Sequence, residues 1–129
     1  MYFRDLSPYE YSRTRPDPAV VNVGWLSRDQ AYEAGDVPGR VLKVLRALAA
    51  KPVNLCRGFH ICEFCPPPPR NGKGHAQPEP GTTGNGEVHV RGPDGLRYVA
   101  PSLIVHYIEV HRYRPPQSFI DAVVARGAV

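Results

Sequence analysis

Three cysteines and a histidine lie within ten residues of one another, in the segment Cys56-Arg-Gly-Phe-His60-Ile-Cys62-Glu-Phe-Cys65. Thiolate sulfur and imidazole nitrogen are the donors that Zn²⁺ takes in tetrahedral protein sites. The Cys62-x-x-Cys65 spacing is that of a zinc knuckle, in which the backbone turns between the sulfurs and its N–H groups point at them. The segment therefore predicts a metal site with zinc as the favoured ion and iron as the alternative.

The local donors differ in how directly their spacing supports binding. His60 and Cys62 are two residues apart, so on an extended segment their side chains face the same side and can reach one ion. Cys56 precedes His60 by four residues, and Gly58 between them allows a bend. Cys56 is thus either a ligand or a thiol packed in the core. The predicted ligands from this segment are His60, Cys62 and Cys65, with Cys56 as the alternate.

A remote histidine is the predicted fourth ligand. His106 lies beside the apolar positions of a predicted helix at 101–113, and we predict that it points inward to the metal. The alternative is a core histidine that hydrogen-bonds to the backbone. His111 follows five residues later, a rotation of about 140° around the axis, so one straight helix is not expected to aim both histidines at one ion. We expect His75 and His89 to be solvated.

A catalytic zinc ion is the main alternative to a structural one. It keeps three protein ligands and a water, and it needs a nearby general base, for which Glu63, Glu87 and Glu109 are the candidates. The His-x-Glu and Pro-Cys-x-x-Cys pattern of zinc deaminases is absent. A thioredoxin-like site needs its Cys-x-x-Cys at a helix N-terminus, whereas four prolines follow Cys65. We therefore expect a structural ion and no enzyme.

The elements that must position these donors form a small single α+β domain with a zinc knuckle, a β-hairpin and three helices. Apolar residues between 38 and 51 recur at helical spacing, and Pro52 ends this helix. Gly92-Pro-Asp-Gly95 joins two predicted strands as a hairpin. The other expected parts are an extended N-terminal arm at 1–18, a single zinc-stabilised domain at 19–129, a strand within 19–26, a mobile Pro/Gly-rich loop at 66–86, hairpin strands at 87–91 and 96–99, and helices at 101–113 and 117–126.

The composition of the 129-residue chain fits a fold that a metal ion stabilises. Its 15 Pro and 12 Gly predict much irregular structure and a thin core. Three clustered cysteines cannot all pair, which indicates a reducing compartment, so we expect a cytoplasmic protein. The N-terminal residues show no secretory signal pattern, and no stretch is apolar enough to span a membrane. The net charge is +4, but the basic residues are scattered, so the nucleic-acid signal is weak.

Several segments also occur in a recognisable order: Val53-Asn54, Arg57-Gly-Phe-His60-x-Cys62-x-x-Cys65, Gly84-Asn-Gly-Glu-Val88, Ala100-Pro-Ser-Leu-Ile-Val-His106-Tyr and Tyr113-x-Pro-Pro116. Over most of residues 20–125 the chain thereby resembles a family of small uncharacterised bacterial proteins, a domain of unknown function. The resemblance implies a zinc site at a Gly-x-His-x-Cys-x-x-Cys segment, which corresponds here to Gly58, His60, Cys62 and Cys65. Cys56 lies outside that segment.

These observations predict a zinc-binding protein with a structural metal site. We expect it to act as a non-enzymatic protein-interaction or regulatory module whose partner is another protein. Two alternatives remain: a zinc-dependent hydrolase with an open coordination position, and a basic nucleic-acid-binding module. We do not expect a membrane partner.

Overall fold

Three helices and a three-stranded sheet pack together in the described part of the chain. The computed structural model describes residues 2–9, 19–53, 60–66, 71–74, 83–84, 86–93 and 95–127. This is a small mixed α+β domain, as predicted. Its elements in chain order are β1 (Val20–Asn22), α1 (Gly39–Ala49), β2 (His60–Ile61), β3 (Thr83–Gly84), β4 (Glu87–Arg91), β5 (Arg97–Pro101), α2 (Ile104–His111) and α3 (Gln117–Gly127).

The central strand of the sheet is β5, which runs parallel to β1 and antiparallel to β4. β4 and β5 form the predicted hairpin, and the N–H of Gly92 donates to the carbonyl of Leu96 at 2.7 Å within its turn. Val88 and Val90 are buried, since alternate side chains of a strand point to the same face. β1 lies within the predicted range 19–26, and Gly24, two residues after its end, has a φ of +78°, outside the extended region.

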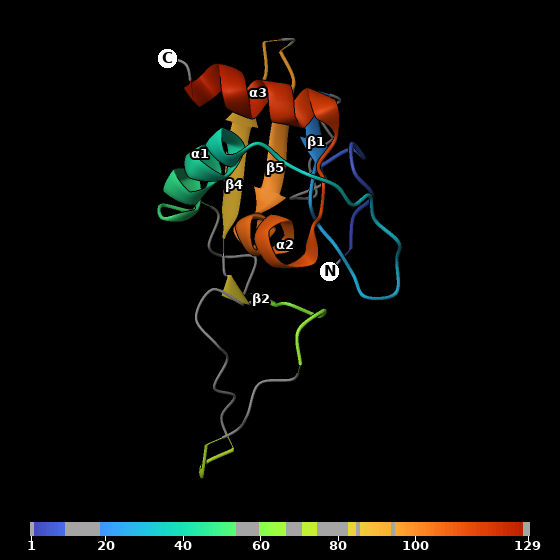
Figure 1. Ribbon diagram of the computed structural model, residues 1–129, viewed down its shortest axis with the longest axis vertical. Coiled ribbons are helices and arrows are strands. Elements are labelled where there is room, and N and C mark those ends of the chain that lie inside the picture. Colours follow the sequence, from blue (N-terminus) through green and yellow to red (C-terminus); the bar gives the residue numbers. More distant parts are fainter. Residues whose placement is uncertain are drawn as a thin grey trace.

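The helices pack on the sheet and on one another. Figure 1 shows α3 at one end of β4 and β5 and α2 at the other, with α1 beside both. α1 contacts α2, α3 and β4, and its Val41 and Leu45 are fully buried. All three predicted helices are present because each buries one apolar face. α2 is shorter than predicted, since Pro101 belongs to β5 and Arg112 has a left-handed φ of 57°.

The described part of the predicted arm, residues 2–9, lies along β1 and forms backbone hydrogen bonds with it. Within it, the Asp5 carboxylate accepts hydrogen bonds from the Tyr113 hydroxyl at 2.8 Å and from the Gly24 N–H at 3.0 Å. The start of the chain is therefore tied to the segment that follows α2. The loop predicted at 66–86 lies largely outside the described residues.

Replacing Gly24 by alanine should destabilise this junction. The added Cβ would lie 3.0 Å from Cδ1 of Ile104, and the positive φ disfavours any L side chain. We expect the free energy of unfolding in urea to fall by about 1–3 kcal/mol. Gly39→Ala is the matched control: its Cβ meets nothing within 4 Å, and the helical position gains up to about 1 kcal/mol. Equal effects of the two substitutions would contradict this account.

Candidate metal centre

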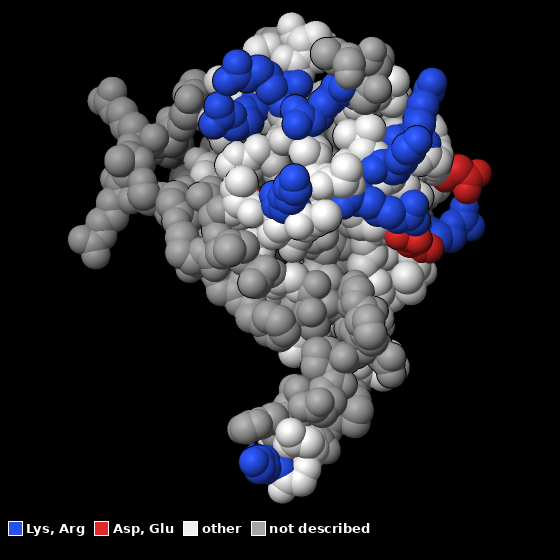
Figure 2. Space-filling view, turned by 90° about the vertical axis from the view of Figure 1, so that its left-hand side faces the viewer, with Lys and Arg blue, Asp and Glu red and all other residues white. Residues whose placement is uncertain are grey.

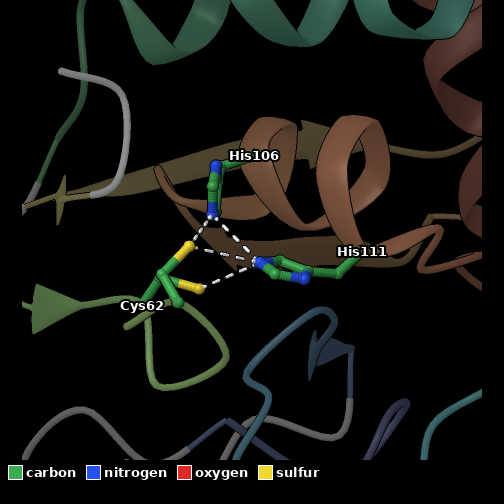
Figure 3. A group of neighbouring side chains, drawn as sticks. Cys62, His106 and His111 are labelled. Atoms are coloured by element: carbon green, nitrogen blue, oxygen red, sulfur yellow. Dashed lines mark hydrogen bonds between the residues drawn. The ribbon is translucent and has the colours of Figure 1, made fainter. Parts of the chain in front are cut away.

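Four side chains bring one donor atom each into a single cluster: Cys62, Cys65, His106 and His111. All four atoms lie within 4.8 Å of one another. The Sγ–Nε2 distances are 3.4 Å for Cys62–His111, 3.3 Å for Cys65–His106 and 3.5 Å for Cys65–His111. The two Nε2 atoms are 3.2 Å apart, and Figure 3 shows both imidazoles reaching from α2 toward Cys62. These residues can hold a metal ion.

The distances within the cluster match the edges of a tetrahedral zinc site. Bonds of about 2.3 Å to sulfur and about 2.0–2.1 Å to nitrogen, at the tetrahedral angle, separate sulfur from nitrogen by about 3.5 Å and two nitrogens by about 3.3 Å. Three of the four sulfur–nitrogen distances are 3.3–3.5 Å and the nitrogen–nitrogen distance is 3.2 Å, and all the donor atoms lie within 4.8 Å of one another. The donor set therefore fits a zinc ion in both chemistry and spacing.

Hydrogen bonds alone do not account for this cluster. The Nε2 atom of His111 lies within 3.5 Å of three others: the sulfurs of Cys62 and Cys65 and the Nε2 of His106. A neutral imidazole nitrogen either donates one proton or offers one lone pair, so it serves one partner at a time. A metal ion shared by all four residues removes the conflict, because each donor then directs its lone pair at the ion.

The two cysteines lie in a turn that follows β2 directly. β2 pairs antiparallel with β3, with His60 opposite Gly84, and this pairing places the start of the turn. The backbone N–H groups of Phe64 and Cys65 donate to the sulfur of Cys62. Such bonds favour the thiolate, the form that binds metal, and they are the arrangement expected from the Cys-x-x-Cys spacing.

The two histidines lie on α2, whose C-terminal end is held by its neighbours. Arg112, in the left-handed conformation, ends the helix immediately after His111. Tyr113 is fully buried, and its hydroxyl donates to Asp5. On the other side, the Phe64 ring packs against the His111 imidazole with ring centroids 5.2 Å apart. The end of α2 therefore has a defined position relative to the cysteine turn.

His111 is the site residue that sequence reasoning did not favour. The rotation of about 140° between His106 and His111 describes only the directions in which they leave the helix axis. Each imidazole carries Nε2 several bonds beyond its Cβ, and helical side chains tilt toward the N-terminus. The two rings therefore converge, with centroids 4.9 Å apart. A second histidine at the end of the same predicted helix was the available signal, and His106 lies in the cluster as expected.

The remaining predicted donors are not part of the described cluster. Cys56 and His75 lie outside the described residues, and of His60 only the backbone is described. The expectation that His89 is solvated is wrong: it is half-buried, with Nε2 3.0 Å from a carboxylate oxygen of Glu87. Tyr9 of the N-terminal segment binds Glu87 beside it, so the start of the chain covers part of this side of the hairpin.

The three glutamates that could serve as the general base of a hydrolase are hydrogen-bonded, ion-paired or exposed to solvent. The buried Glu87 carboxylate accepts hydrogen bonds from the Tyr9 hydroxyl at 3.0 and 3.1 Å. Glu109 forms an ion pair of 2.7 Å with Arg46, and Glu63 is exposed in the cysteine turn. Four protein donors also complete a tetrahedral shell by themselves, which is the pattern of structural zinc sites.

Burial sets the protonation of the donors. It raises the pKa of the Cys62 thiol, although the N–H bonds from the turn oppose this effect. Burial also lowers the pKa of both histidines. For His106, the positive charge of a protonated His111 lowers the pKa further. The imidazoles are therefore neutral and ready to bind metal at neutral pH, whereas Cys62 must lose its proton when the ion binds.

A family model covers most of the chain. The family model described as "Domain of unknown function (DUF7919)" matches residues 1–124. No curated protein and no solved structure matches the chain. Among the described helices, none has the length and apolar character needed to cross a membrane.

Single substitutions test the ligand set. We expect loss of any one of the four donors to weaken zinc binding by about 100-fold or more, because the shell is then incomplete. Zinc content by mass spectrometry and competition with a chromophoric chelator measure this. The variants are Cys62→Ser, Cys65→Ser, His106→Ala and His111→Ala, with Cys56→Ser and His60→Ala as controls that should keep one zinc per chain. If His60→Ala loses the ion and His111→Ala keeps it, the ligand set predicted from sequence holds instead.

The protonation of Cys62 predicts how zinc affinity depends on pH. Because the thiol pKa is raised, protons compete with the ion above neutral pH, so affinity should increase as the pH rises from neutral to alkaline. The histidines, with lowered pKa values, add competition only in the acidic range. Chelator competition at a series of pH values measures the profile. An affinity that is constant above neutrality would rule out Cys62 as the titrating ligand.

Proposed function

We propose that this chain, which belongs to the DUF7919 family, is a zinc protein with a structural ion and acts as a non-enzymatic protein-interaction or regulatory module. The observation that carries the proposal is the convergence of two thiols and two imidazoles at tetrahedral spacing. Catalytic zinc ions keep a position for water, whereas four protein ligands close the shell. A mixed sulfur and nitrogen set of this kind favours zinc among the divalent ions.

The ion would join two parts of the chain that also meet through Phe64 of the cysteine turn, which packs against Tyr107 and His111 of α2. The cysteine turn follows a two-stranded ribbon, β2 with β3, and a ribbon of that size is marginally stable in water by itself. α2 belongs to the main core through Ile104 and Tyr107. Structural zinc binds with roughly 10–16 kcal/mol in small peptides, comparable with the whole stability of a small domain. Such an ion can fix the ribbon to α2 in addition to the packing of Cys62 and Phe64 against the core.

The cellular setting follows from the same chemistry. Thiols at this spacing remain free to bind zinc only where they are kept reduced, so we assign the protein to the cytoplasm. A closed structural site leaves the ion without a reaction to perform. The function then lies on the protein surface that the ion helps to hold, and the partner we propose is another protein.

Removing the metal tests the structural role. Treatment of the zinc-loaded protein with a chelator should lower the unfolding temperature by about 10 °C or more, and added Zn²⁺ should restore it. Hydrogen exchange should show that protection is lost first in residues 60–66 and at the end of α2, because only these segments contact the ion. A chelated protein with unchanged unfolding temperature and exchange would contradict a structural ion.

Cobalt substitution separates the structural proposal from the hydrolase alternative. Co²⁺ in a closed shell of two sulfurs and two nitrogens should give the absorption spectrum of a tetrahedral site, and azide should leave it unchanged. A spectrum that shifts when azide is added would reveal an open coordination position and would favour the zinc hydrolase.

A further inference from the structure

A groove between α1 and α3 is the strongest feature that the metal centre does not use. It has a volume of about 630 Å³. Val44, Ala47 and Leu48 of α1 and Val124 of α3 form its apolar floor. Val44, Leu48 and Val124 are half-buried and Ala47 is exposed, so this aliphatic surface is only partly covered by the chain's own side chains.

Three cations line the groove beside this floor: Arg40, Lys43 and Arg126. All three are exposed, and none forms an ion pair with an acid among the described residues. Other surface arginines are already neutralised, since Arg46 pairs with Glu109 and Arg112 with Asp36. Figure 2 shows Lys and Arg side chains gathered on this face, with few acids near them. The groove therefore lacks the negative charge that its cations would attract.

The groove runs along the axis of α1, as the spacing of its lining residues on that helix shows. Positions 40, 43, 44, 47 and 48 recur at i, i+3, i+4, i+7 and i+8, so they form one continuous stripe along the helix. The buried positions Val41 and Leu45 lie next to this stripe on the helix and face the core. An elongated occupant that runs along α1 would meet the cations Arg40 and Lys43 near the start of the helix and the aliphatic side chains Val44, Ala47 and Leu48 beyond them.

We propose that this groove binds an acidic amphipathic helix of a partner protein. Its apolar side chains would cover the floor, and its Glu or Asp side chains would pair with Arg40, Lys43 and Arg126. Nucleic acid offers phosphates but no aliphatic side chains for the floor, and a lipid surface is flat where this site is concave. The inference deepens the proposed interaction function by naming the surface and the chemistry of the partner.

A designed peptide tests the groove. The probe is a fluorescent helical peptide of about 18 residues, with Leu at i, i+3, i+4 and i+7 and Glu on both sides of that stripe. We expect saturable binding to the zinc-loaded protein by fluorescence anisotropy. The double variant Arg40→Glu/Lys43→Glu should weaken it by about tenfold or more. The matched control Arg28→Glu/Lys51→Glu changes the net charge equally outside the groove and should weaken it by less than about twofold.

A second variant probes the floor without touching the cations. Ala47→Glu places an acid on an exposed helical position, and it should also weaken binding by about tenfold, whereas Ala47→Ser should have little effect. Absence of saturable binding, equal weakening by both double variants, or equal binding of a scrambled peptide would overturn the proposal. So would tighter binding of single-stranded DNA or of anionic vesicles. Zinc content and unfolding temperature of each variant report separately on the structural ion.

Discussion

The convergence of four donor atoms on one point is the constraint on which the rest of the structure depends. Cys62 and Cys65 come from a turn after a two-stranded ribbon, and His106 and His111 come from a helix that belongs to the main core. A shared ion binds its four donors within a narrow range of distances and angles. The ribbon and the helix must therefore keep a fixed position relative to each other. The packing of Phe64 against Tyr107 and His111 supports the same arrangement.

Contacts in the apolar core, away from the four donors, hold α2 in position. α2 rests on α1, and the chain leaves α2 through a left-handed residue, Arg112, into the fully buried Tyr113. A left-handed conformation costs an ordinary residue about 1–2 kcal/mol, which the burial of the tyrosine ring offsets. The Tyr113 hydroxyl then binds Asp5 of the N-terminal segment. The start of the chain thus helps to hold the last histidine in place without touching the site.

The metal centre and the basic groove use different faces of the same scaffold. α1 packs on α2, which carries the histidines, and on α3, which forms one wall of the groove. α1 therefore connects the element that carries the histidines to the groove. A structural ion at the four donors, as proposed, and an uncovered surface with unpaired cations together suit a domain that recognises a partner.

The sequence by itself determined what depends on neighbouring residues. Apolar periodicity predicted the three helices, Gly92-Pro-Asp-Gly95 predicted the hairpin, and Cys62-x-x-Cys65 predicted a turn whose N–H groups face a sulfur. Tertiary structure alone decided which histidines meet the cysteines, the burial of His89 against Glu87, and the cations left unpaired beside α1. Periodicity shows which face of an element is buried. It does not show which elements meet, nor where the ends of long side chains lie, because those positions depend on contacts between residues far apart in the chain.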